Sequence, residues 1–228
     1  MMIMMMMNVE EHHNSLAGQV KKGTTTVGIM CKDGIILAAD KKATAFYTEN
    51  RNEKKVFPIN QAVVMTTAGS VGDLQYLYRV VKAEAALSEM RSEVMSATSV
   101  ATLLSNILNN TKYFPYMVAL LVGGYDEGTL PVLYSVDAIG GATRGEKIVV
   151  TGSGGPIALG VLQSQFRENI SIDDAKVLAV KALVSARERD VYTGGKSLDI
   201  AVITPEGVSL VKTEDINKLI EKEQATLA

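Results

Sequence analysis

The order of strand-like and helix-like patterns along residues 24–228 limits the chain to few folds. Strands come in blocks separated by pairs of helices, and one further helix closes the chain. Strands are predicted over 26–32, 35–39, 61–67, 117–124, 130–136, 147–151, 198–204 and 208–212. Helices are predicted from 71 onward, over 99–111 and 156–167, from 171 to 189, and near the C-terminal end. The polar stretch 44–55 is predicted to form a loop or short strands.

Hairpin signals join most of these strands. Asp33-Gly34 lies between two apolar runs, and Asp126-Glu127-Gly128 and Pro205-Glu206-Gly207 lie at two later turns. Strands joined by hairpins pair antiparallel, so the sheets should be mostly antiparallel. Helices that arrive in pairs suit helical layers outside a central β-sandwich. With no linker-like stretch inside 24–228, the sequence predicts a single α+β domain.

Composition excludes several classes of protein. The 228 residues carry a net charge of -2 and contain no block of basic residues, which argues against general nucleic-acid binding. Cys31 is the one cysteine, so no internal disulfide can form and a reducing compartment fits. Because Cys31 sits in an apolar strand pattern, we expect a buried small hydrophobe and no reactive thiol.

The first 23 residues are interpreted as a leader. The Met-rich opening is too short for a membrane span, and it lacks the basic leading region of a secretory signal. It runs into Glu10-Glu11-His12-His13, and two adjacent histidines without further ligands make a weak metal site. From Thr25 the pattern becomes that of a strand, so the leader is predicted to end near there.

The junction Lys22-Gly23-Thr24-Thr25-Thr26 suggests a chemistry. If the Gly23–Thr24 bond is cut, Thr24 gains a free α-amine, whose ordinary pKa of about 7.7–8.0 suits a general base. An adjacent base is what a threonine hydroxyl needs to become a nucleophile. The leader would then be a chemical off-switch. A simpler reading is that three threonines begin a β-strand, which they favour.

Four positions could converge near Thr24 if neighbouring strands end at one edge of a sheet. Asp40 and Lys42 end the second strand, Lys55 ends the polar stretch, and Gly69 follows the third strand. A lysine there would disfavour protonation of a neighbouring amine, a carboxylate would hold that lysine, and a backbone N–H would stabilise an oxyanion. Taken singly, each position also has a structural reading as a strand end, a solvated charge or a tight turn.

Five motifs occur in an order and spacing that resemble the proteasome β subunit of archaeal type. They are Thr24-Thr25-Thr26-Val27-Gly28, Lys54-Lys55-Val56-Phe57, Ala68-Gly69-Ser70-Val71-Gly72-Asp73, Thr151-Gly152-Ser153-Gly154 and Arg189-Asp190-Val191-Tyr192-Thr193-Gly194-Gly195. The resemblance covers essentially all of 24–228. It implies the four-layer αββα sandwich of N-terminal-nucleophile hydrolases, with residues 1–23 as a propeptide removed by autocatalysis between Gly23 and Thr24.

The resemblance also implies roles for single residues. Thr24 matches the nucleophile, and Asp40 and Lys55 match the catalytic carboxylate and lysine. Ser153 and Asp190 match the outer residues that support the new N-terminus, and Gly69 matches the oxyanion donor. Two positions depart from the usual pattern: Thr193 stands where serine is common, and Lys42 stands where arginine is common. The loop before Lys54 is about one residue shorter than usual, which bears on whether Lys54 or Lys55 is the catalytic lysine.

Substrate-binding residues follow from the same resemblance. Thr44 and Gly69 match positions that hold the substrate backbone as an added strand. Ala43, Thr67 and Val71 match positions that line the pocket for the side chain before the cut bond, and their small or apolar character favours hydrophobic side chains. Glu53 near the pocket floor would admit basic side chains. The expected cleavage is therefore broad.

The resemblance implies a threonine endopeptidase of the 20S proteasome core that degrades unfolded polypeptides in the cytoplasm. It would need no metal and no organic cofactor. Seven copies would form a ring, two such rings would stack, α-subunit rings would cap both ends, and an ATPase regulator would deliver substrate. Neither a membrane nor a nucleic acid is an expected partner.

Three other functions would account for parts of the sequence. A catalytically silent β subunit would share the fold and the ring, but it has no chemical need for Thr24, Asp40 and Lys55 together. Another amidohydrolase with an N-terminal threonine would share the mechanism but not the Gly-Ser-Gly and Arg-Asp motifs. A nucleotide enzyme could use the glycines of 152–155 as a phosphate loop, yet no Gly-Lys-Ser/Thr end follows them.

Overall fold

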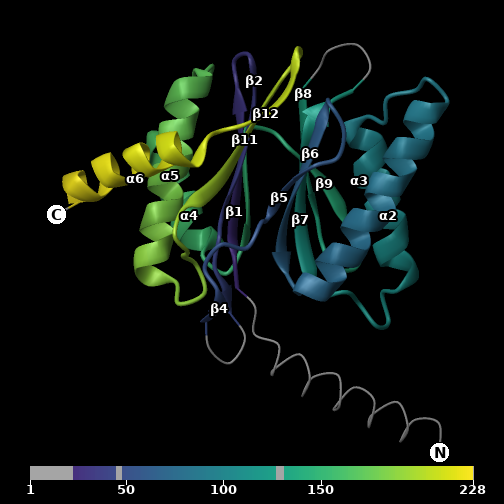
Figure 1. Ribbon diagram of the computed structural model, residues 1–228, viewed down its shortest axis with the longest axis horizontal. Helices are drawn as coiled ribbons and strands as arrows, with labels where there is room; N and C mark the ends of the chain where they lie inside the picture. The colour runs from purple at the N-terminus through teal and green to yellow at the C-terminus, as the bar shows by residue number, and fades with distance from the viewer. Residues whose placement is uncertain (1–22, 45–47, 127–130, 228) are drawn as a thin grey trace, which may run out of the picture.

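Two stacked β-sheets form the centre of the molecule (Figure 1). The computed structural model describes residues 23–44, 48–126 and 131–227. Most of the predicted leader and part of the predicted turn at 126–128 therefore lie outside the described residues. All strand pairs in the two sheets are antiparallel, as the hairpin signals predicted.

Each sheet has five strands. The first has the order β10-β1-β2-β11-β12 and comprises β1 (Thr25–Cys31), β2 (Gly34–Asp40), β10 (Ile148–Gly152), β11 (Leu198–Thr204) and β12 (Gly207–Leu210). The second has the order β5-β6-β7-β8-β9 and comprises β5 (Val56–Pro58), β6 (Val63–Gly69), β7 (Val118–Tyr125), β8 (Pro131–Val136) and β9 (Ala142–Gly145). A separate pair joins β3 (Ala43–Thr44) to β4 (Thr48–Asn50) within the predicted polar stretch.

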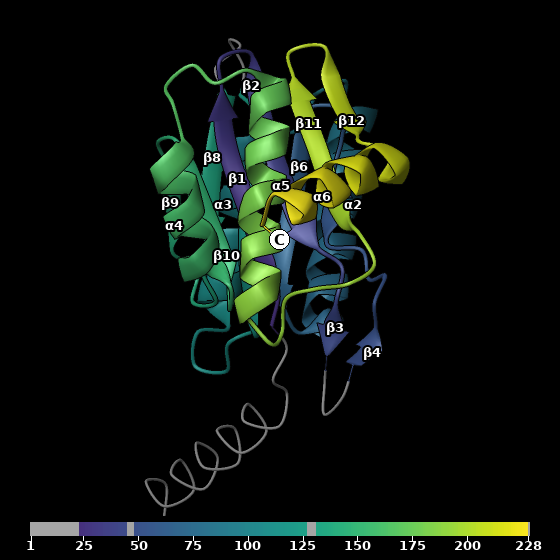
Figure 2. The ribbon, with the colours of Figure 1, turned by 90° about the vertical axis from the view of Figure 1, so that its left-hand side faces the viewer.

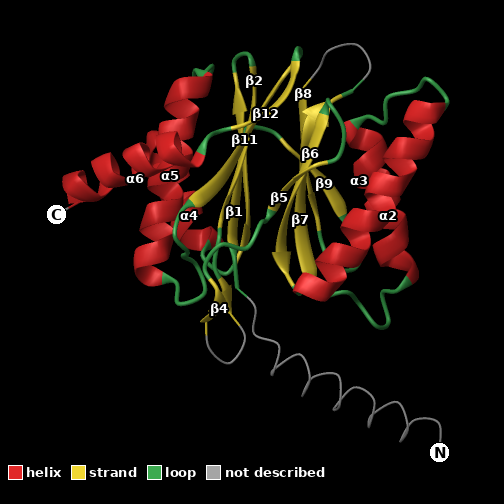
Figure 3. Ribbon diagram, in the orientation of Figure 1, coloured by secondary structure: helices red, strands yellow, loops and turns green. Residues whose placement is uncertain are grey.

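Helices cover both outer faces of this sandwich (Figure 3). The second sheet packs on α2 (Val71–Met90) and α3 (Ala97–Asn110). The first sheet packs on α4 (Gly155–Gln165), α5 (Ile172–Arg189) and α6 (Thr213–Leu227), and Figure 2 shows α5 running along that sheet between α4 and α6. The four-layer αββα class is thus confirmed, and none of the helices in the described ranges is long and apolar enough to cross a bilayer.

Three apolar cores hold the four layers together. One lies between the first sheet and its helices, one between the second sheet and its helices, and one between the two sheets. Ile36 and Ile35 are neighbours on β2 but belong to the outer and the central core, because successive side chains of a strand point to opposite faces. A strand buried on both faces reads as a continuous apolar run, as β2 does.

Two short strands at the edges of the second sheet were not predicted from the sequence. β5 is three residues long and ends in Pro58, which lacks an N–H and is tolerated at a sheet edge. β9 is four residues long and mostly exposed, so it shows no apolar alternation. The helix predicted from residue 171 is observed as α5. Ser171 caps its N-terminus, because its side chain accepts a hydrogen bond from the N–H of Asp174 at 3.1 Å.

Cys31 is expected to be inert in the folded chain. It is a free thiol, only 9% exposed, and burial raises its pKa from 9.0 to about 12. At pH 8 the reactive thiolate is therefore about a thousandfold rarer than in an unfolded chain. A chromogenic disulfide reagent should leave the native protein unlabelled and label one thiol per chain in urea. Labelling at the same rate in both states would contradict the burial of this side chain.

Candidate active site

Thr24 lies directly before β1, at the end of the first sheet where β2 and β10 finish. The antiparallel register places Thr25 opposite Gly152 and Thr26 opposite Ala39, so the start of β1 adjoins both strand ends. Thr24 is 4% exposed, and its hydroxyl donates a hydrogen bond to the carbonyl oxygen of Gly23 at 2.8 Å. The hydroxyl of the predicted nucleophile therefore lies against the peptide group that is predicted to be cut.

Gly23 is the residue that this junction can accommodate. A Cβ at position 23 would lie 1.9 Å from the Cβ of Tyr192 and 2.5 Å from the Oγ of Ser153. Both distances are shorter than non-bonded atoms tolerate. The packing therefore gives a physical reason for glycine directly before Thr24.

Asp40 is a fully buried carboxylate that accepts four hydrogen bonds. Its Oδ1 accepts from the backbone N–H of Thr25 at 2.9 Å and from the Nζ of Lys55 at 3.0 Å. Its Oδ2 accepts from the backbone N–H groups of Lys42 and Gly194, both at 3.0 Å. Four donors compensate for the loss of water around a buried charge. Asp40 thereby ties the start of β1, the end of β2 and the segment after α5 to one point.

Lys55 is the lysine that pairs with Asp40. It is 4% exposed, and its Nζ also donates to the carbonyl oxygen of Lys42 at 2.6 Å. Burial lowers the pKa of Lys55 from its ordinary value, and the neighbouring Asp40 charge acts in the opposite direction. Lys54 instead lies over the ring of Phe57, 5.6 Å from its centroid. The ammonium of Lys42 turns away and donates to the carbonyl oxygen of Val191 at 2.5 Å.

A second polar group lies beside Thr24. Asp190 Oδ2 accepts from the hydroxyls of Ser153 at 2.6 Å and Thr193 at 2.5 Å. The Ser153 hydroxyl also lies 3.5 Å from the carbonyl oxygen of Thr24. The structure thus brings together Ser153, Asp190 and Thr193, and the threonine hydroxyl makes the bond that a serine there would make.

Gly69 ends β6 at the same end of the molecule. Its φ of +121° lies in the region that favours glycine, and a Cβ there would lie 2.0 Å from the carbonyl oxygen of Met117. Gly69 and Thr24 both line a shallow cavity on one side and a smaller pocket on the other. That position is compatible with the predicted oxyanion donor, which stays a prediction.

The smaller pocket collects the residues that were predicted to bind substrate. It is lined by Thr24, Ala43, Thr44, Glu53, Lys55, Thr67, Gly69 and Val71, together with Gly23, Lys42 and Leu74. Leu74 was not predicted to line the pocket, and it lies on the buried face of α2. The hydroxyls of Thr44 and Thr67 are buried without a hydrogen-bond partner, and Glu53 accepts a hydrogen bond from the side chain of Asn50 at 2.8 Å.

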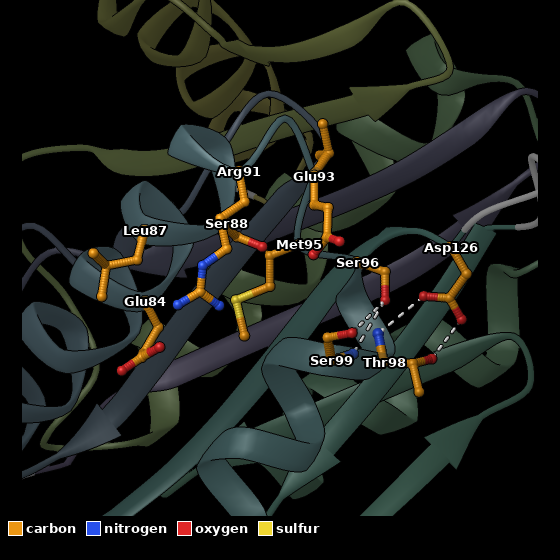
Figure 4. Close-up of a pocket in the computed structure, with 11 residues that line it drawn as sticks. Glu84, Leu87, Ser88, Arg91, Glu93, Met95, Ser96, Thr98, Ser99 and Asp126 are labelled. Atoms are coloured by element: carbon orange, nitrogen blue, oxygen red, sulfur yellow. Dashed lines mark hydrogen bonds between the residues drawn. The ribbon is translucent and has the colours of Figure 1, made fainter.

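A wider cavity of about 590 Å³ lies elsewhere, between the end of α2 and the start of α3 (Figure 4). Its polar side chains mainly satisfy the first turn of α3: Ser96 accepts from the N–H of Ser99, and Asp126 accepts from the N–H of Thr98. A carboxylate at a helix N-terminus is stabilising by itself. None of the residues that line this cavity also lines the pocket at Thr24.

Comparison with known proteins shows to which family the chain belongs. A family model described as proteasome subunit matches residues 20–203. This chain belongs to the proteasome subunit family.

Among curated relatives, the proteasome subunit beta of Ferroglobus placidus is 46% identical over 206 residues, which cover 90% of this chain and 97% of the relative. The proteasome subunit beta of Archaeoglobus profundus is also 46% identical, with 89% and 94% of the two chains covered. The proteasome subunit beta of Methanococcus vannielii is 40% identical over 219 residues, which cover 95% of this chain and 98% of the relative. The expected resemblance to archaeal proteasome β subunits is therefore confirmed.

Proposed function

We propose that this proteasome β subunit is an active threonine endopeptidase that cuts its own Gly23–Thr24 bond before it cuts substrates. The observation that carries the proposal is the buried Asp40–Lys55 ion pair, whose lysine lines the same pocket as Thr24. A buried ion pair contributes little to net stability, so a role in stability alone explains it poorly. A charged pair close to a hydroxyl and to the peptide bond predicted to be cut is instead typical of a site for nucleophilic catalysis.

Removal of the leader is the first reaction. Thr24 Oγ attacks the carbonyl carbon of Gly23, and the C–N bond breaks as the nitrogen takes a proton and becomes the α-amine of Thr24. The leader is then held as an ester on Thr24 Oγ, and water hydrolyses the ester to a carboxylate on Gly23 and a free hydroxyl. Before the cut no α-amine exists. Burial lowers the pKa of Lys55, which lines the same pocket, so the neutral amine of Lys55 can accept the hydroxyl proton and pass it to the leaving nitrogen.

Cleavage of substrates repeats this chemistry with the new amine as base. Thr24 Oγ attacks the substrate carbonyl, and its proton passes to the α-amine directly or through water. The positive charge of Lys55, held by Asp40, disfavours protonation of that amine and stabilises the alkoxide. The N–H of Gly69 stabilises the oxyanion, a contribution of roughly 3–4 kcal/mol for such a donor. Water then releases the acyl ester.

The pocket determines which bonds are cut. Ala43, Thr67, Val71 and Leu74 present small or apolar groups to the side chain before the cut bond, and Glu53 adds a negative charge to the pocket lining. We therefore expect hydrophobic side chains first and basic ones second. Thr44 and Gly69 border the same pocket, where an extended substrate backbone would add as a strand.

Membership of the proteasome subunit family supports assembly into a 20S core with α subunits. We propose two stacked rings of seven copies, capped by α-subunit rings and served by an ATPase regulator that delivers unfolded polypeptides. A cytoplasmic location suits this assembly, because enclosure in the particle protects other proteins from an unselective nucleophile. A silent structural subunit of the same particle is the alternative that the first experiment addresses.

The first experiment is the intact mass of the chain after co-expression with its α subunits. An active subunit should lose residues 1–23 and begin with Thr24, and the particles should hydrolyse short fluorogenic peptides with a hydrophobic residue before the cut bond. A chain that keeps its leader in assembled particles would contradict self-activation. A chain that is processed but hydrolyses neither peptides nor unfolded protein would contradict the endopeptidase.

A further inference from the structure

Thr25, the residue after the predicted nucleophile, contacts both polar groups of the site. Its backbone N–H donates to Asp40 Oδ1 at 2.9 Å, which links it to the Asp40–Lys55 pair. Its hydroxyl lies 2.5 Å from the Thr193 hydroxyl, which in turn lies 2.5 Å from Asp190 Oδ2. The Thr25 side chain is fully buried. Neither the motifs nor the proposed reaction gave this hydroxyl a role.

The direction of the hydrogen bonds can be assigned from the number of protons. A threonine hydroxyl has a single proton to donate, and an ionised carboxylate has none. The Thr193 hydroxyl donates its hydrogen bond to Asp190, because the carboxylate of Asp190 can only accept. The short contact between Thr25 and Thr193 therefore needs the Thr25 hydroxyl as donor. The resulting chain of donors runs from Thr25 to Thr193 and from Thr193 to Asp190.

The same reasoning applies to Ser153 on the other side of Asp190. Ser153 Oγ lies 2.6 Å from Asp190 Oδ2 and 3.5 Å from the Thr24 carbonyl oxygen. The shorter contact is the stronger hydrogen bond, so the Ser153 hydroxyl donates to Asp190. The lone pairs of Ser153 Oγ then remain available beside Thr24. They are suited to accept a hydrogen bond from the α-amine that appears after the cut. Thr25 thus stands at the start of a hydrogen-bonded series that ends beside the new amine.

We propose that Thr25 is a positioning residue, whose hydroxyl fixes Thr193 and Asp190 so that Ser153 presents its lone pairs to the α-amine of Thr24. This inference rests on the proposed function, because the amine exists only after the Gly23–Thr24 bond is cut. Position 25 is well placed for this task. It is covalently attached to Thr24, so any shift of the segment after α5 relative to Thr25 is also a shift relative to the reacting groups.

Thr26 offers a matched control. Its hydroxyl lies 2.6 Å from the Thr151 hydroxyl, so it also makes a close hydroxyl–hydroxyl contact, and it is also fully buried. Thr26 is the next residue on β1, and successive side chains of a strand point to opposite faces. Thr26 therefore points away from Thr193 and Asp190, and the loss of its hydroxyl should affect folding but not the position of Ser153.

The experiment compares Thr25→Val, Thr25→Ser and Thr26→Val in full-length chains assembled with α subunits. Valine has the shape of threonine but leaves Thr193 without its donor, so kcat for a fluorogenic peptide should fall about tenfold with KM nearly unchanged. Serine keeps the donor and should restore kcat to within about threefold of wild type. Thr26→Val should stay within about twofold of wild type. Thermal unfolding of all particles measures any general loss of stability.

Each outcome bears on the inference. Equal kcat in Thr25→Val and wild type would overturn it, as would an equal loss in Thr26→Val and Thr25→Val, or a rise in KM alone. If Thr25→Val does not assemble, Thr25→Ala removes the same hydroxyl without a methyl group against Thr193, and the same loss of kcat is expected. An inactive wild-type particle would overturn the proposed function itself, which the parallel wild-type assay distinguishes from a failure of Thr25 alone.

Discussion

Thr24→Ala should leave the leader on the chain and reduce peptide hydrolysis by at least about four orders of magnitude. The substitution removes the hydroxyl that lies 2.8 Å from the carbonyl oxygen of Gly23, and with it the atom that attacks in both proposed reactions. The neighbouring hydroxyls of Thr25 and Ser153 are already hydrogen-bonded, to Thr193 and Asp190 respectively. Intact mass reports the leader and a fluorogenic peptide reports hydrolysis, both on particles that contain only the variant chain.

Thr24→Ser is the control for this variant. Serine keeps the hydroxyl and the future α-amine but loses the methyl group, so processing should continue and part of the activity should remain. Alanine and serine variants should unfold at similar temperatures, which separates lost chemistry from lost structure. Loss of residues 1–23 from Thr24→Ala would contradict cleavage by this hydroxyl and point to a different protease.

Much of the fold could be predicted because its signals are local. Strand–hairpin–strand patterns gave the antiparallel sheets, and paired helices gave the outer layers. The strands β5 and β9 were missed since they are short edge strands, whose pairing depends on a neighbour rather than on their own apolar pattern.

Part of the candidate site was predictable from residues that stand where apolar strands end. Asp40 ends β2 and accepts a hydrogen bond from the N–H of Thr25, and Gly69 ends β6 and lines the same pocket as Thr24. The choice between Lys54 and Lys55 could not be made from adjacent residues of the same type. It depends on the direction of each side chain at the start of β5, where Lys55 points inward to Asp40 and Lys54 lies over Phe57.

Thr25 could not be recognised from the sequence for a different reason. A threonine in a strand is already explained by its β propensity, and its partner Thr193 is 168 residues away. Only the fold places the segment after α5 against the start of β1. Tertiary structure therefore supports the proposed second role of a residue that already has an adequate local explanation.

Lys55→Met is the second substitution with a large expected effect. Methionine has a similar length but no charge, so it should fill the pocket and abolish the ion pair with Asp40. We expect peptide hydrolysis to fall about a thousandfold or more, because the charge that stabilises the alkoxide and disfavours protonation of the amine is lost. Leader removal should be blocked as well, which intact mass would show.

Lys54→Met separates this effect from the general loss of a lysine. Lys54 is the adjacent residue and is exposed, and its contact with Phe57 survives in part through the methionine side chain. Its activity should stay within about twofold of wild type, since exposed charges contribute little. The free energy of unfolding should distinguish the two variants too. Lys55→Met leaves Asp40 buried without its ion-pair partner, which lowers the free energy of unfolding by up to about 3–5 kcal/mol, and the three remaining backbone donors to Asp40 reduce this loss. A Lys55→Met particle that matures and hydrolyses peptides as well as Lys54→Met would show that the buried pair serves structure alone, and the assignment of Lys55 to catalysis would fall.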